Sequence, residues 1–113
     1  MINCLIKNLK LVKEGNSLRD KFTLLWYSLT LPFNYLRILF GGHLSKKLIF
    51  DVIVKNNDGV FHCKRDIGLV QTASQTYEPN LRKYFNLTEG AFFDVGANIG
   101  KYTIAVGNKL KQG

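Results

Sequence analysis

The feature that most constrains this chain is the stretch FFDVGANIGKYT, residues 92–103, in which two glycines join an apolar run to a segment of helical character. The apolar run predicts a short buried strand over 91–95, and the residues after the second glycine predict a helix over about 100–110. A strand, a glycine turn and a helix in this order place helix amide groups at the carboxyl end of a strand, where α/β folds bind nucleotide-like ligands. The stretch therefore predicts a ligand-binding turn in an α/β fold.

The spacing of this turn disfavours two phosphate-binding motifs. A P-loop needs four residues between its first glycine and the Gly-Lys pair, followed by Ser or Thr, whereas three residues intervene here and Tyr102 follows Lys101. A dinucleotide fingerprint, GxGxxG, needs glycine at the positions that Asn98 and Lys101 occupy. Lys101 would also obstruct the close contact between helix and strand that the third glycine allows.

A third motif fits better. An acidic residue and three turn-forming residues stand at every second position, namely Asp94, Gly96, Asn98 and Gly100. This spacing resembles the first motif of class I methyltransferases, acidic-x-Gly-x-Gly-x-Gly, which binds S-adenosylmethionine. Asn is a reasonable replacement for the middle glycine because it tolerates left-handed backbone conformations. The whole string resembles the signature of the FkbM-type methyltransferase family, (I/F)DVGANIG-x-(Y/F)-(T/S), and the resemblance covers about 48–110.

The resemblance implies roles for individual residues. The loop that passes around the cofactor would consist of Gly96, Ala97, Asn98 and Gly100. Asp94 would either orient the methionine end of the cofactor or cap the following helix. Tyr102 and Thr103 would either contact the amino-acid portion of the cofactor or pack beneath the loop. Glu78 would either reach the pocket or be an exposed carboxylate at a helix start. No catalytic residue and no metal ligand is assigned.

The implied activity is O-methylation of a hydroxyl on a sugar, a glycan or a small metabolite. Methyl transfer requires mainly that the sulfonium be aligned with the acceptor and shielded from water. Only 13 residues follow Gly100, so the second strand, whose acidic residue would hold the ribose, is missing. We therefore expect an incomplete Rossmann-like fold, inactive alone, from either a truncated reading frame or a split protein that a C-terminal partner chain completes.

Residues 1–46 predict a helical N-terminal extension, and residues 47–113 predict a hairpin followed by the start of the methyltransferase domain. Apolar residues at helical spacing indicate a first helix that ends at Gly15, followed by a capping box, SLRD, at 17–20. Over 22–40 we expect two helices, because Thr30 and Pro32 are typical of a helix start and Gly41-Gly42 of a helix end.

The hairpin is predicted from two apolar runs, 48–54 and 60–64, joined by the turn sequence NNDG. Alternation places Leu48, Phe50, Val52 and Val54 on one face. After the hairpin we expect an irregular segment over 66–76 and a short helix that begins at Pro79.

The chain carries 16 Lys and Arg against 8 Asp and Glu, a net charge of +8. This excess indicates either an acidic partner or a solvated basic surface. Pro32, Asn34 and Arg37 argue against a membrane span over 22–40. The basic first helix and the aromatic residues after it favour either peripheral membrane contact through residues 1–40 or packing on a core. The alternative function is therefore a non-catalytic basic module that docks on membrane surfaces or polyanions.

The cysteines and histidines argue against disulfide and zinc sites. Their positions in the sequence do not match the spacing of a zinc-binding motif, and they are Cys4, Cys63, His43 and His62. The start of the chain lacks a secretory signal. We therefore expect a cytoplasmic protein, either free or peripheral at the inner membrane surface. Nucleic-acid binding is disfavoured because the basic residues are scattered and accompany no nucleic-acid-binding motif.

Overall fold

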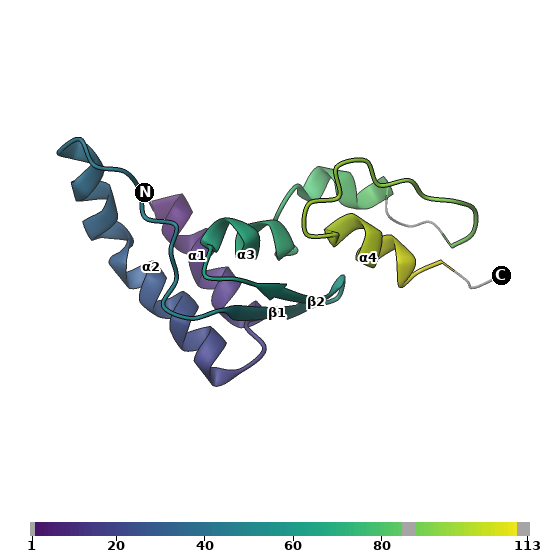
Figure 1. The fold of residues 1–113 in the computed structure, drawn as a ribbon, viewed down its shortest axis with the longest axis horizontal. Helices are drawn as coiled ribbons and strands as arrows, with labels where there is room; N and C mark the ends of the chain where they lie inside the picture. The colour runs from purple at the N-terminus through teal and green to yellow at the C-terminus, as the bar shows by residue number, and fades with distance from the viewer. Residues whose placement is uncertain (1, 85–87, 111–113) are drawn as a thin grey trace.

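The computed structural model describes residues 2–84 and 88–110. This part of the chain is a mixed α/β structure that measures 55 × 28 × 21 Å (Figure 1). Its elements, in chain order, are α1 (Ile2–Glu14), α2 (Leu18–Leu39), β1 (Val52–Asn56), β2 (Gly59–Cys63), α3 (Ile67–Ala73), the 3₁₀ helix η1 (Pro79–Tyr84) and α4 (Lys101–Gly107). The hairpin and the first three helices form one end of the molecule, and η1 and α4 form the other.

The first helix and the capping box are confirmed. The Ser17 hydroxyl accepts the Asp20 amide at 3.1 Å, and the Asp20 carboxylate accepts the Ser17 amide at 2.9 Å. Two orphan amides at the start of α2 are thereby satisfied reciprocally.

The prediction of two helices over 22–40 is wrong, because α2 continues through Pro32 as one helix. A proline inside a helix removes one backbone hydrogen bond and costs about 3 kcal/mol. Packing offsets this cost: Leu31 is buried before the proline, and Tyr35, one turn later on the same face, packs against the core. The predicted end is confirmed, since the amides of Gly41 and Gly42 bond the carbonyls of Ile38 and Arg37 at 3.0 Å each. This is the pattern of a Schellman cap.

The hairpin is confirmed with shifted bounds. β1 and β2 pair antiparallel, with Val52 opposite Cys63 and Asn56 opposite Gly59. Strand β1 begins four residues later than predicted, and the chain before it pairs irregularly, through the Leu48 amide and the Arg65 carbonyl at 3.1 Å. Three of the four residues predicted to share a face are buried, but Phe50, which precedes the regular strand, is half exposed.

Two further predictions are wrong. Residues 66–76 are not irregular, because Asp66 accepts the Gly68 amide at 2.7 Å and thereby caps α3. The predicted strand over 91–95 does not form, and Phe93 and Val95 are 87% and 96% exposed. A strand needs a neighbour for its backbone hydrogen bonds. In the described part of the chain the only sheet is the β1–β2 hairpin, with which this segment does not pair. The predicted helices at Pro79 and near 100–110 are present as η1 and α4.

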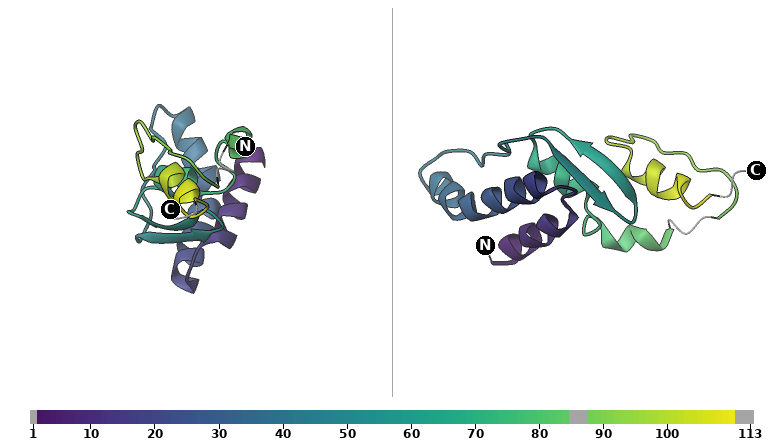
Figure 2. Two further views of the ribbon diagram at one scale, coloured as in Figure 1. Left: turned by 90° about the vertical axis from the view of Figure 1, so that its right-hand side faces the viewer. Right: turned by 90° about the horizontal axis from the view of Figure 1, so that it is seen from below.

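The core draws on both halves of the chain. Figure 2 shows how the backbone elements that carry it are arranged, with α1 and α2 side by side and the hairpin next to them. The buried members of the core are Leu11, Leu24, Tyr27, Leu31, Leu48, Val52, Val54, Phe61, Cys63, Ile67, Val70 and Ala73. α1 and α2 pack on each other, and the core joins them to the hairpin and α3. The division of the chain at residues 46 and 47 stays a prediction. Within the described ranges, no helix has the length and apolar character needed to cross a membrane.

Candidate cofactor-binding loop

The glycine loop, residues 94–100, takes left-handed backbone conformations at three alternate positions. Gly96, Asn98 and Gly100 have φ values of 75°, 51° and 73°. Glycine and asparagine are the residues that adopt this region at the lowest cost. A Cβ atom added to Gly96 would meet no atom within 4 Å, so glycine is favoured there by backbone conformation and not by lack of space.

Asp94 fixes the loop to the start of α4. Its Oδ2 accepts the Thr103 amide at 3.1 Å and the Thr103 hydroxyl at 2.6 Å. Thr103 is the third residue of α4, whose amide an N-cap side chain usually accepts. The N-cap is Gly100, which has no side chain to serve as acceptor. Asp94, six residues before the N-cap position, therefore supplies the side-chain acceptor that Gly100 lacks.

Lys101 anchors the loop to the rest of the molecule. Its side chain is buried, and its ammonium donates to the Ser74 carbonyl at 2.6 Å and to the Tyr77 carbonyl at 3.3 Å. The ammonium also lies 5.1 Å from the centroid of the Tyr77 ring, within the range of a cation–π contact. No local pattern in the sequence predicts this role for Lys101, because its carbonyl partners lie 27 and 24 residues earlier.

A polar cluster connects this anchor to the first helix. The carboxylate of Glu14, at the end of α1, accepts hydrogen bonds from the Ser74 hydroxyl and from the side-chain amide of Asn56, at 2.9 Å each. It also accepts the backbone amide of Gln75 at 3.3 Å. Because Ser74 is also the carbonyl partner of Lys101, one residue links α1 to α4.

The other predicted site residues lie around this loop. The Ala97 carbonyl accepts the Gly100 amide at 2.7 Å, which closes the turn. Tyr102 is half-buried, and its ring centroid lies 5.9 Å from the ammonium of Lys101. Glu78 is exposed, with a φ of 46°, directly after the Tyr77 carbonyl that Lys101 contacts. The structure thus joins the segment before η1 to the glycine loop through Lys101.

Three hollows open elsewhere on the molecule. The first, about 210 Å³, lies between α1 and α3 and includes Asn8, Leu11 and Tyr77. The second, about 290 Å³, lies beside α2 and is lined by residues such as Tyr27 and Arg37. None of these three hollows is lined by residues of the glycine loop, in which Gly96 and Asn98 are exposed.

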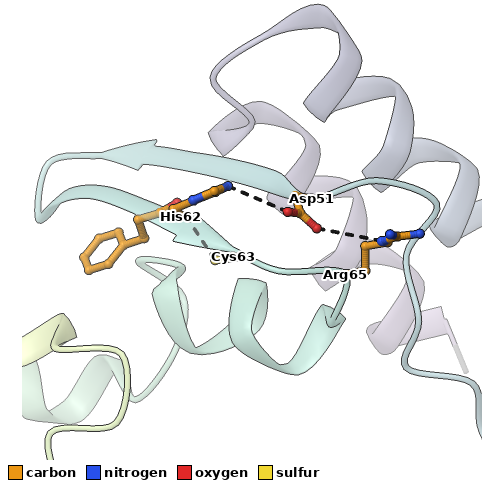
Figure 3. Close-up of polar contacts among 5 residues, drawn as sticks. Asp51, His62, Cys63 and Arg65 are labelled. Carbon is orange, nitrogen blue, oxygen red and sulfur yellow. Dashed lines mark hydrogen bonds and ion pairs between the residues drawn. The ribbon is translucent and has the colours of Figure 1, made fainter.

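The third hollow, about 410 Å³, carries the ion pairs of Figure 3. The Asp51 carboxylate lies between His62 and Arg65, at 4.0 Å and 3.9 Å. These side chains are exposed, and such pairs contribute at most about 1 kcal/mol. Cys63 points to the opposite, buried face, and burial raises the pKa of its thiol from 9.0 to about 11. A buried thiol that stays protonated is a poor nucleophile.

The described residues contain no group of three or more His, Cys, Asp or Glu side chains that could hold a metal ion. Comparisons of the chain with models of protein families, with curated proteins and with solved structures give no significant match.

Proposed function

We propose that the glycine loop binds the methionine end of S-adenosylmethionine as part of a methyltransferase that acts on a hydroxyl of a sugar, a glycan or a small metabolite. The observation that carries the proposal is the run of left-handed residues at Gly96, Asn98 and Gly100, within the string that resembles the FkbM-type signature. Such a loop turns its backbone outward and allows a ligand to approach its amide groups closely.

The contacts of Asp94 and Lys101 support the proposal. Asp94 holds the loop by capping α4 at Thr103, and Lys101 holds it by donating to the Ser74 carbonyl. A loop whose conformation is fixed before binding loses less entropy when the ligand binds. Because Lys101 is committed to backbone carbonyls, it is not the phosphate-binding lysine of a P-loop.

The segment 91–95 is not a strand in this structure, and in the enzyme that we propose it would become one by pairing with neighbouring strands of a Rossmann-like sheet. Phe93 and Val95, which stand two residues apart, expose apolar side chains that neighbouring strands would cover. We expect the 113-residue chain by itself to bind the cofactor weakly, because Gly96 and Asn98 of the glycine loop are exposed and would cover only one end of the ligand.

Isothermal titration of the 113-residue chain with S-adenosylmethionine, S-adenosylhomocysteine and ATP tests this proposal. We expect weak, saturable binding of the first two and none of ATP. Gly96→Ala should weaken binding by about fivefold to thirtyfold, because a left-handed alanine costs about 1–2 kcal/mol. Gly41→Ala is the matched control, since Gly41 has a φ of 80° and equally open space but lies at the end of α2. No binding of either sulfur compound, or preferential binding of ATP, contradicts the proposal.

A further inference from the structure

One face of α2 carries apolar side chains that the rest of the described chain leaves largely exposed. Its exposed members, together with the residue that ends the helix, are Leu18, Phe22, Leu25, Trp26, Leu29, Phe33, Leu36 and Phe40. We name this set the outer stripe. Leu29 is 60% exposed and Phe33 is 73% exposed, so the stripe is open at its centre as well as at its ends. In Figure 1, α2 lies along the left edge of the molecule, with the other elements on its inner side.

The spacing of the outer stripe makes it one continuous surface. An α-helix advances by about 100° per residue, so these positions fall within an arc of about 100° along a helix about 33 Å long. The residues that bury the helix against the core, such as Leu24, Tyr27 and Leu31, fall on the opposite side. α2 is therefore apolar on two opposed faces, and only one of them is used for packing within the chain.

Basic residues flank the outer stripe on both sides. Arg19 and Arg37 follow it on one side of the helical projection, and Lys21 lies on the other. Residues 1–47 contain eight lysines and arginines and two acids. Both acids are engaged within the fold, Asp20 in the buried capping box and Glu14 in the cluster with Ser74. This end of the molecule is thus strongly cationic.

From this arrangement we infer that the outer stripe of α2 lies in the interface of an anionic lipid bilayer, parallel to its surface. An apolar stripe with aromatic residues inserts among the acyl chains, while flanking basic side chains contact anionic headgroups. The inference is independent of cofactor binding, since α2 lies at the opposite end of the molecule from the glycine loop.

A second copy of the chain fits this surface less well. Two stripes packed face to face would bring Arg19, Lys21 and Arg37 of one copy near the same residues of the other, and like charges at an interface are unfavourable. The stripe is also wider than the two-position seam of a coiled coil, because Trp26, Phe33 and Phe40 broaden it along one side.

Trp26 gives a direct signal, because it is the single tryptophan of the chain and lies half exposed against Phe22, with ring centroids 6.3 Å apart. Vesicles made of equal parts of phosphatidylcholine and phosphatidylglycerol should shift its fluorescence to shorter wavelength and should sediment with the whole 113-residue chain. Vesicles of phosphatidylcholine alone should bind much less, and added salt should weaken the binding.

The decisive variant is Leu29→Glu/Phe33→Glu, which places two charges in the centre of the outer stripe. We expect its partition onto the anionic vesicles to fall by on the order of a hundredfold. Val60→Glu/Tyr84→Glu is the matched control, because it makes the same change in charge at two exposed apolar positions away from α2. Circular dichroism should show that both variants fold as the parent does.

Four outcomes overturn the inference. They are a lack of binding to the anionic vesicles, equal binding to the neutral vesicles, equal loss of binding in the control variant, and a concentration-dependent dimer that the Leu29→Glu/Phe33→Glu variant abolishes. The last outcome, measured by sedimentation velocity without lipid, would assign the stripe to a second copy. Binding of S-adenosylmethionine by the same variant should be unchanged, so failure here is distinguishable from failure of the proposed function.

Discussion

The two ends of the molecule are held together in different ways. Residues 2–74 share a core of twelve buried side chains, to which three helices and both strands contribute. Among the described residues of 75–110, the buried side chains are those of Lys101, Ala105 and Val106, and Ile99 and Ile104 are partly buried against the core. Nonpolar packing therefore determines the first region, whereas a few specific contacts position the second.

The contacts between the two regions can be named individually. The Lys101 ammonium bonds the Ser74 carbonyl, and the Asn108 side-chain amide donates to the Asp58 carbonyl at 3.0 Å. Ile104 approaches the hairpin so closely that a Cβ atom on Gly59 would lie 2.5 Å from its Cγ2. The second region is therefore ordered by polar contacts to backbone atoms, together with the packing of Ile99 and Ile104 against the core of the first region.

The largest expected effect concerns the core. Leu24→Ala, at a position that is 1% exposed, should lower the free energy of unfolding by about 2–5 kcal/mol, because it leaves a cavity. Chemical denaturation measures this value. Leu29→Ala, five residues later on the same helix but exposed, is the control and should cost no more than about 0.5 kcal/mol. Equal costs would mean that α2 does not pack as described.

The next effect concerns the anchor of the second region. Lys101→Met removes the bonds to the Ser74 and Tyr77 carbonyls and should reduce the hydrogen-exchange protection of α4 by on the order of tenfold. Protection of the β1–β2 hairpin should not change. Lys55→Met, at an exposed position on β1, is the control. An equal fall in the protection of α4 and of the hairpin would contradict the conclusion that Lys101 anchors only the second region.

A third measurement concerns the pH dependence of the core. The pKa of Cys63 is raised to about 11 in the folded chain, so the stability due to its buried neutral thiol is complete below pH 9. That stability should be lost between about pH 9 and 11, by at most about 1.4 kcal/mol per pH unit. Denaturation across this range, compared with that of Cys63→Ala, isolates the contribution of the thiol, because every other group is the same in the two proteins.

The smallest effect concerns the cap of α4. Thr103→Val removes the hydroxyl that donates to Asp94 but leaves the backbone amide bond in place. We expect the free energy of local opening, measured by hydrogen exchange, to fall by about 0.5–1 kcal/mol in the glycine loop and the first turn of α4 and to stay the same elsewhere. Thr30→Val, which removes a hydroxyl bonded within α2, is the control. A change spread over the whole chain would contradict a local role for Asp94.

Local signals in the sequence predicted the parts of the fold that depend on neighbouring residues. The capping box at Ser17, the turn NNDG and the helix end at Gly41 each require only a few adjacent residues, and all three are present. The left-handed conformation of Asn98 was likewise readable from residue type.

The remaining errors come from tertiary packing. Pro32 predicted a break, but the packing of Tyr35 against the core extends α2 beyond it. The strand over 91–95 was predicted from an apolar pattern that has no pairing partner among the described residues. The helix α3 was not predicted because Gly68, a poor helix former, lies in its first turn, although Asp66 caps the helix. Lys101 was missed as an anchor because its carbonyl partners lie 24 and 27 residues earlier, outside the reach of any local pattern.

The position of Glu14 has a practical consequence for anyone who shortens this protein. A chain that starts at residue 47 would look like a natural way to isolate the portion that contains the glycine loop, yet it would lack the carboxylate that bonds Asn56, Ser74 and Gln75. Ser74 in turn carries the carbonyl that receives Lys101. Trimming the first helix would therefore disturb the glycine loop from a distance, and a loss of the proposed cofactor binding in such a fragment would be an artefact of the chosen boundary.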